Sequence, residues 1–158
     1  MSDCKSFVPH LIVSNAAKAI DFYTKAFGAT ELSRFNAPGT NKIMHASLKI
    51  NGGTLFLNDD MSESTGEEPT TAEALGGSPV ILHLQVDNAD RAWKQAVAAG
   101  AQVAFPLADQ FWGERYGQLR DPFGLKWSIS QTVSKPTNQE LEKGAKASLE
   151  RAREHAHV

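Results

Sequence analysis

The sequence predicts an α+β fold built from two copies of one βαβββ unit, related by a pseudo-twofold axis and followed by a C-terminal helix. The first observation is a repeat, because Phe7 to Ala16 (FVPHLIVSNA) returns as Val80 to Ala89 (VILHLQVDNA). The second is that each copy continues through a helical pattern into three short apolar segments. A unit used twice differs from a solenoid, which needs three or more short repeats. We therefore expect two curved halves with equivalent walls around a cavity.

The first copy opens with a strand and a helix. Phe7 to Val13 is rich in apolar and branched residues, as strands are. Ser14 or Asn15 caps the helix that follows, and Gly28 fits its left-handed end. Between these signals the apolar residues follow helical spacing: Ala16, Ala19, Ile20, Tyr23 and Phe27.

The second copy repeats these signals with different side chains. Asp87 or Asn88 caps its helix and Gly100 ends it. The buried stripe of this helix is Ala92, Trp93 and Ala96. His10 and His83 occupy matching places in the two copies.

Three further strands are expected in each half. In the first half they are Thr30 to Phe35, Ile43 to Ile50 and Thr54 to Asn58, with a hairpin turn at Asn51-Gly52. In the second half they are Gln102 to Phe105, Tyr116 to Arg120 and Lys126 to Ser130, with a type I turn at Asp121 to Gly124. Each half therefore has the order strand, helix, strand, strand, strand.

These elements divide one compact domain into four parts. The first module spans residues 1–58, an acidic linker spans 59–79, the second module spans 80–131 and a helical extension spans 132–158. The linker contains no basic residue, and we interpret it as a solvated connector or a cover for the cavity mouth. In the extension, Thr137 and Glu140 match a capping box. Its narrow apolar stripe predicts packing on the domain or on a partner chain.

Composition excludes several function classes. The chain has 158 residues, is 41% apolar and carries a net charge of −2, which does not indicate nucleic-acid binding. No apolar run approaches the roughly 20 residues of a membrane helix, so we expect no membrane association. The start has no signal-peptide pattern, and the single cysteine, Cys4, cannot form an internal disulfide. We expect a cytoplasmic protein in which Cys4 has no catalytic role.

The end of the second module carries a family resemblance. Tyr116 to Ile129 (YGQLRDPFGLKWSI), together with the two βαβββ units, resembles the vicinal oxygen chelate superfamily of glyoxalase I, extradiol dioxygenases, fosfomycin-resistance enzymes and bleomycin-binding proteins. Phe111 to Ile129 and His45 to Asp59 resemble its PhnB-like branch. The resemblance covers roughly residues 5 to 131. It implies a glyoxalase-like fold with a cavity, and a homodimer.

The resemblance also implies four metal ligands, two in each module. Carried over to this sequence, they fall at Val8, Leu57, Ile81 and Ser128. Aliphatic side chains have no lone pair for a divalent ion, and a neutral serine replaces a carboxylate poorly. We therefore expect neither a metal at these positions nor any other cofactor. This departure also argues against inherited glyoxalase or dioxygenase chemistry.

Three histidines offer an alternative. His10 and His83 lie two residues beyond the first-strand metal positions, which keeps them on the same strand face. We therefore expect both to point into the cavity and to face each other across the pseudo-twofold axis. Several roles are open to these histidines. Together with His45 they form a shifted metal site, or they contact a ligand or act as a general base. The remaining alternative is that their ring nitrogens are hydrogen-bonded within the fold. The pair Asp59-Asp60 either assists such a metal or caps a loop.

The segment Phe111 to Gly117 (FWGERYG) concentrates chemical groups around two glycines. Trp112 and Tyr116 offer flat surfaces for stacking, and Arg115 offers a fork for a carboxylate or phosphate. The alternative is a hairpin whose Arg115 pairs with Glu114 or with the linker acids. Both interpretations stay open at the level of sequence.

From these residues we expect a protein that binds a small organic molecule in the predicted cavity. Phe56 and Trp127 are placed at corresponding positions, so at least one is expected in the core. The expected ligand-binding residues are His10, His45, Phe56, His83, Trp112, Arg115 and Tyr116. No catalytic residue is assigned, since none of the common hydrolase, phosphate-loop, CxxC or HExxH motifs occurs.

Three functions compete. The first is a metal-independent binding protein of the bleomycin-resistance kind. The second is a metal-dependent lyase, isomerase or dioxygenase that uses the shifted histidine site, or acid-base chemistry from His10, His83 or Glu114. The third is an interaction protein that acts through its C-terminal helix and its dimer surface rather than through the cavity. The vacant metal positions favour the first.

Overall fold

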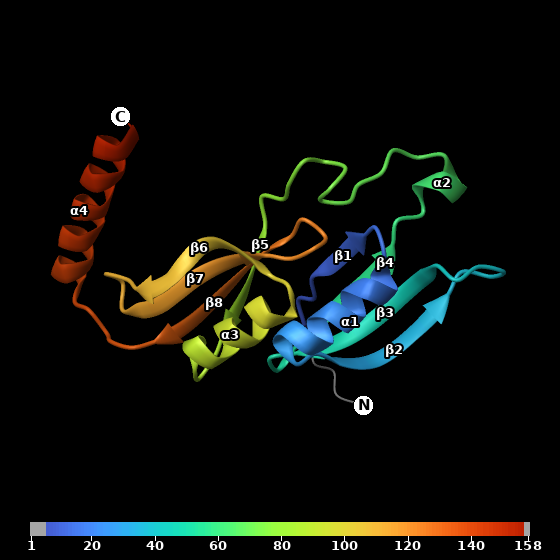
Figure 1. Ribbon diagram of the computed structural model, residues 1–158, viewed down its shortest axis with the longest axis horizontal. Coiled ribbons are helices and arrows are strands. Elements are labelled where there is room, and N and C mark those ends of the chain that lie inside the picture. The colour runs from blue at the N-terminus through green and yellow to red at the C-terminus, as the bar shows by residue number, and fades with distance from the viewer. Residues whose placement is uncertain (1–5, 157–158) are drawn as a thin grey trace.

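Two four-stranded sheets form the body of the protein (Figure 1). The structure is a computed structural model and describes residues 6–156. The strand order is β1-β4-β3-β2 in the first sheet and β5-β8-β7-β6 in the second. The first module comprises β1 (His10–Val13), α1 (Ala16–Phe27), β2 (Thr30–Asn36), β3 (Ile43–Ile50) and β4 (Gly53–Asp59). The second comprises β5 (Ile81–Gln85), α3 (Ala89–Ala99), β6 (Gln102–Asp109), β7 (Glu114–Arg120) and β8 (Lys126–Thr132).

The two modules share one topology, which confirms the predicted pair of βαβββ units. In each, the first strand runs parallel to the last, and the other neighbouring strands are antiparallel. His10 lies opposite Phe56 and His83 lies opposite Ser128, so the two histidines occupy matching places as expected. The same pairing brings the first strand of each module to a free edge of its sheet.

The strand register corrects two positions inferred from the sequence. Phe56 of β4 is the counterpart of Ser128, because each lies opposite the repeated histidine. Leu57, which we had aligned with Ser128, is one residue off and lies fully buried. Trp127 likewise corresponds to Leu55 rather than to Phe56, since both pair with the buried leucine of the preceding strand. A one-residue slip turns a strand side chain to the other face, so the correction matters for the site.

Both module helices are capped in the same way. The side chain of Asn15 accepts from the backbone N–H of Lys18, and the side chain of Asn88 accepts from that of Arg91. The asparagine, and not the residue before it, is therefore the cap in each copy. Both helices end at the predicted glycines, which adopt left-handed conformations.

The last strand of each module also holds the first turn of its helix. Asp59 Oδ1 accepts from the Ala16 N–H at 2.7 Å, and Gln131 Oε1 accepts from the Ala89 N–H at 2.9 Å. Asp59 Oδ2 additionally accepts from the Ile43 N–H at 2.6 Å. Asp59 is thus engaged in the fold, which matches the loop-capping role that we considered for it.

One hydrophobic core joins the two modules. The helices α1 and α3 contact each other between the sheets (Figure 1). Tyr23 of α1 crosses to the second module, where its ring lies 5.1 Å from Trp127 and 6.2 Å from Phe123. The largest fully buried side chains come from both halves of the chain: Trp127, Tyr23, Ile43, Leu48, Leu55, Leu57, Leu119 and Ile129.

A buried carboxylate, Asp121, ties the β7–β8 turn to this core. One oxygen accepts from the backbone N–H groups of Phe123 and Leu125, and the other accepts from the Tyr23 hydroxyl at 2.8 Å and the Trp127 indole at 2.9 Å. Burial raises the pKa of Asp121, although these hydrogen bonds oppose the rise. Burial, together with the neighbouring carboxylate, raises the pKa of Tyr23 well above its ordinary value. The turn signal Asp121 to Gly124 is therefore confirmed and also links the modules.

The linker and the C-terminal extension complete the described chain. The linker contains α2 (Ser62–Thr65), and its Thr71 and Ala72 are buried. The extension forms α4 (Asn138–Ala156), which projects from the body (Figure 1). Its capping box is confirmed, since the Thr137 N–H donates to Glu140 and the Glu140 N–H donates back to the threonine hydroxyl. None of the helices in residues 6–156 is long and apolar enough to cross a membrane.

Candidate functional site

Each sheet has one face against the helices and one open face. Strand alternation sends Leu48 of β3 into the core and its neighbour Ser47 to the other side. On the open face of the first module, the rings of His45 and Phe56 lie 4.8 Å apart, and His10 lies 6.1 Å from both. Phe35 of β2 stacks on His45 at 5.8 Å. We call the four rings His10, Phe35, His45 and Phe56 the first aromatic cluster.

The open face of the second module carries a matching cluster. Tyr116 takes the place of His45 in the register, and His83 stacks on it at 6.3 Å. Trp112 meets the edge of Tyr116 at 5.6 Å, and Phe105 lies 6.3 Å from it. We call His83, Phe105, Trp112 and Tyr116 the second aromatic cluster. Among the described residues, no ring contact joins the two clusters.

The structure therefore divides the predicted ligand residues between two sheets and leaves Arg115 outside both clusters. The strand β7 begins at Glu114, which is earlier than we expected, so Arg115 points to the opposite face from Tyr116. Arg115 donates two hydrogen bonds to Asp90, at 2.8 and 2.9 Å, and one to Asp109 at 3.0 Å. The Asp90 and Asp109 hydrogen bonds raise the pKa of Arg115.

This geometry corrects our alternative interpretation of Arg115 as well. Its partners are acids of α3 and β6, whereas we expected Glu114 or the linker acids. Glu114 instead accepts a hydrogen bond from the hydroxyl of Ser130 on β8. The predicted strand began at Tyr116, but Glu114 and Arg115 also pair with β8 and extend it.

His83 is held at both ring nitrogens. Its Nδ1 lies 2.8 Å from Ser128 Oγ, and its Nε2 lies 3.1 Å from Gln85 Oε1. The Gln85 amide nitrogen donates to the Thr132 hydroxyl at 3.1 Å, and the amide oxygen faces the histidine. In this arrangement Nε2 carries the proton, and in the neutral ring Nδ1 accepts from Ser128.

His10 is held at one ring nitrogen only. Its Nε2 lies 2.6 Å from Asn58 Oδ1, and the Asn58 amide nitrogen donates to the Asp59 carbonyl at 2.8 Å. The position that Ser128 fills in the second module is occupied by Phe56, which has no hydrogen-bonding group. In the part of the chain that the structure describes, Nδ1 of His10 has no hydrogen-bond partner.

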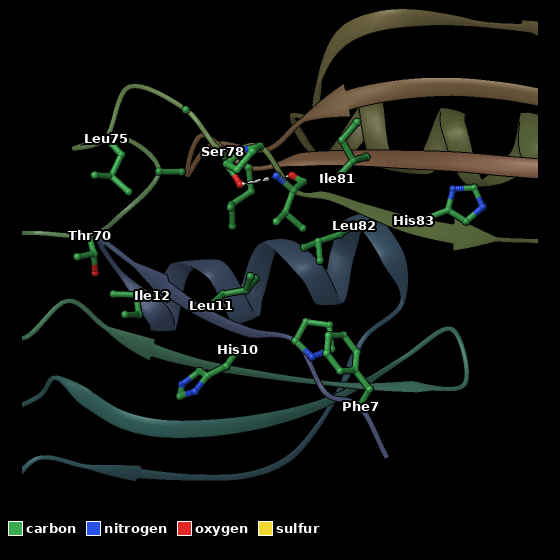
Figure 2. A pocket seen from close by; sticks show the side chains of 16 residues that line it. Phe7, His10, Leu11, Ile12, Thr70, Leu75, Ser78, Ile81, Leu82 and His83 are labelled. Atoms are coloured by element: carbon green, nitrogen blue, oxygen red, sulfur yellow. Dashed lines mark hydrogen bonds between the residues drawn. The ribbon is translucent and has the colours of Figure 1, made fainter. Parts of the chain in front are cut away.

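A cleft of about 630 Å³ lies between the free edges of β1 and β5 and reaches the linker. Figure 2 shows Leu11 and Leu82 extending into the space between these strands, with Leu75 and Ser78 on the linker side. Its walls are mostly apolar and include Leu11, Leu75, Val80, Ile81, Leu82 and Leu125. This size and character are typical of small-molecule sites.

Both repeated histidines border the cleft, but they do not face each other across it. Their rings belong to separate sheets and lie apart in Figure 2. Each ring is bonded to its own sheet, His10 to Asn58 and His83 to Ser128. The expectation of two histidines meeting across the pseudo-twofold axis is therefore wrong for a single chain.

The positions implied for a metal do not fit one. Val8, Phe56 and Ile81 have no donor atom, and the Ser128 hydroxyl is bonded to His83. The shifted alternative needs His10, His45 and His83 together, but the structure brings only the first two near each other. Within residues 6–156 no group of three or more histidine, cysteine or acidic side chains is arranged to hold a metal ion.

Sequence reasoning missed several residues of these open faces. Asn58, Gln85, Phe35 and Phe105 contact the predicted histidines or extend their clusters. Asn58 was within reach, because it lies two residues beyond Phe56 on the same strand and hence on the same face. Phe35 and Phe105 lie on outer strands, whose irregular register hides their direction from a pattern of alternation.

Comparisons with known proteins agree with this architecture. The family model described as the Glyoxalase/Bleomycin resistance protein/Dioxygenase superfamily matches residues 6–129. An uncharacterised protein of Mycobacterium tuberculosis is 48% identical over 134 residues, covering 85% of this chain and 78% of the relative.

Two solved structures show the same fold. TioX from Micromonospora is 30% identical, with a TM-score of 0.64 over 82% of this chain and 100% of its own. A PhnB protein from Bacillus cereus is 16% identical, with a TM-score of 0.63 over 81% of this chain and 100% of its own, and so supports the fold alone.

Proposed function

The chain belongs to the glyoxalase/bleomycin resistance protein/dioxygenase superfamily, and we propose that within it this protein binds a small organic molecule without the family metal. The observation that carries the proposal is the apolar cleft of about 630 Å³ between β1 and β5. A cleft of this volume accommodates a ligand of drug-like size.

The lack of donor side chains at the metal positions supports binding rather than metal-dependent chemistry. The glyoxalase and dioxygenase reactions implied by the family rely on a divalent ion, and three of the four positions carry side chains without a donor atom. Apolar walls favour the ligand by removing its surface from water. The aromatic clusters next to the cleft supply flat surfaces for stacking.

A homodimer remains part of the proposal. The open faces expose large apolar side chains on outer strands, with Phe35 56% and Phe105 43% exposed. Exposed aromatic rings at the free edges of sheets are typical of surfaces that meet a partner. A second copy of the chain would cover them and would close the open faces from water.

The test of cleft binding is the fluorescence of Nile red, a neutral apolar dye, titrated with the full chain. Ile81→Asp places a charge in the cleft wall, at a residue that is 39% exposed. We expect the dissociation constant to rise at least about tenfold, because a carboxylate in an apolar site resists desolvation.

Val97→Asp is the matched control. Val97 is 40% exposed, lies on α3 and does not line the cleft. We expect less than about a twofold change in dye affinity for this variant. Equal losses in both variants, or a wild-type chain that fails to bind the dye, would reject the cleft as the binding site.

A further inference from the structure

We propose that the ligand of the cleft is an uncharged molecule that donates a hydrogen bond to Nδ1 of His10. This inference rests on the proposed function, because it assigns the chemistry of a ligand in the cleft that His10 borders. Three features carry it: the tautomer of His10, the lack of a partner for its second nitrogen among the described residues, and the charges around the cleft.

The tautomer of His10 follows from a chain of hydrogen bonds. A backbone carbonyl only accepts, so the Asn58 atom 2.8 Å from the Asp59 carbonyl is the amide nitrogen. The Asn58 oxygen therefore faces His10 and accepts from its Nε2 at 2.6 Å. With the proton on Nε2, Nδ1 of the neutral ring is an acceptor.

The second module shows what satisfies such an acceptor. Nδ1 of His83 lies 2.8 Å from the hydroxyl of Ser128. The equivalent residue in the first module is Phe56, whose ring lies 6.1 Å from that of His10 and offers no donor. Of the two repeated histidines, His10 is thus the one whose nitrogen is left for a ligand.

The charges around the cleft disfavour an anion. Among the described residues that line it there is no lysine or arginine, and Arg115 is engaged by Asp90 and Asp109 elsewhere. The linker that borders the cleft carries carboxylates, with Glu73 exposed next to the lining residue Ala72. Moving an ion into an apolar site without a partner charge is costly, so an uncharged ligand is favoured.

Three probes of one shape separate these requirements. 2-Naphthol donates a hydrogen bond, 2-methoxynaphthalene does not, and 2-naphthoate is an anion. Calorimetric titration of the full wild-type chain should give binding of 2-naphthol about fivefold tighter than of the ether, which is the value of one neutral hydrogen bond. 2-Naphthoate should bind at least about tenfold more weakly than 2-naphthol.

His10→Phe should remove the preference for 2-naphthol over the ether, because it keeps a ring and deletes the acceptor. Asn58→Ala should reduce the same preference while the histidine stays, because it releases the tautomer. His83→Phe should leave the preference between the two probes intact even if both affinities fall. These ratios are internal to each variant, and circular dichroism checks that each one folds.

The outcomes distinguish the two proposals. If none of the three probes binds while Nile red also fails, the proposed function falls. If 2-naphthol and the ether bind equally to the wild-type chain, or His10→Phe keeps the preference, the hydrogen bond to His10 is rejected and cleft binding survives. If 2-naphthoate binds most tightly and Arg115→Ala abolishes that binding, the anion site predicted from the sequence is restored and the uncharged ligand is rejected.

Discussion

In the first module, the strand residue opposite the repeated histidine is Phe56, whereas in the second module it is Ser128. The backbone plan is the same in both halves, down to the asparagine caps and the glycines that end the helices. The difference of one side chain changes what each histidine does. His83 is hydrogen-bonded at both nitrogens, whereas one nitrogen of His10 has no partner among residues 6–156.

A repeated residue therefore need not have a repeated role. A histidine acquires its role from the groups that fix its tautomer and occupy its second nitrogen. In this protein those groups come from the last strand and from the neighbouring amide, which the repeat does not preserve. The internal repeat thus identifies the histidines, and the differences between the copies distinguish a histidine that is bonded at both nitrogens from one that is bonded at a single nitrogen by the described residues.

The turn between the last two strands is a second point of difference. The first module closes it with Asn51-Gly52, both in left-handed conformations, as the sequence predicts. The second module has a turn one residue longer, built on the buried Asp121. Asp121 accepts from Tyr23 of the other module through a buried contact. The first turn reaches the second module through an exposed one, in which the Asn51 amide donates to the Gln85 carbonyl at 2.7 Å.

The largest expected effect comes from breaking that turn. Asp121→Ala leaves four buried donors without an acceptor and should lower the free energy of unfolding by about 4 kcal/mol. Pro122→Ala, at an exposed position of the same turn, should cost less than about 1 kcal/mol. Urea denaturation measures both. A loss below about 1 kcal/mol for Asp121→Ala would show that the turn does not hold the modules together.

Much of the fold was predictable because short sequence patterns determine helix caps, turns and strands. The helix caps, the hairpin turn at Asn51-Gly52 and the strand Ile43 to Ile50 lie where the sequence predicts them. The repeat supplied the topology, since two copies of one segment imply two copies of one unit. Strand ends were predicted less accurately, since β6 and β7 are each longer than predicted.

The site was less predictable, because it depends on which face each side chain occupies. Gly117 lies inside the predicted strand, but the sequence does not show why it is a glycine: a Cβ there would approach Trp93 of α3 within 2.6 Å. A glycine at this position allows α3 to pack closely against β7, and it is not required by a turn. Once the strand includes Glu114, alternation moves Arg115 to the helix side and keeps Tyr116 on the open face. Neither step is visible in the sequence without the register.

The next comparison concerns the residues that hold the first turn of each helix. Asp59 is buried and accepts from two backbone N–H groups, whereas Gln131 accepts from one. Asp59→Ala should therefore cost about 2 to 3 kcal/mol of unfolding free energy, and Gln131→Ala about 1 kcal/mol. Chemical denaturation of the two variants gives the difference directly. Equal losses would mean that the charge and the second acceptor contact of Asp59 contribute nothing.

The smallest effect concerns Tyr23, the first module's contribution to the Asp121 contact, and it appears only at alkaline pH. Burial, and then the carboxylate of Asp121, raises the folded-state pKa of Tyr23 well above its ordinary value. The unfolded chain releases this proton at roughly pH 10, before the folded chain does, so deprotonation favours unfolding above that pH. The contribution is complete below pH 10 and declines as the pH rises toward the folded-state value. At pH 11 it should have lowered the unfolding free energy by about 1 kcal/mol relative to pH 9.

Tyr23→Phe removes the titrating group and isolates this term. The variant is less stable at pH 9 because Asp121 loses a donor, but its stability should fall less steeply than that of the wild type between pH 9 and pH 11. Lysines and the other tyrosine titrate in both proteins, so their contributions cancel in the difference. The gap between the two unfolding free energies should therefore narrow as the pH rises. A constant gap across this range would show that the Tyr23 hydroxyl titrates alike in the folded and unfolded chains, and that its burial against Asp121 does not control it.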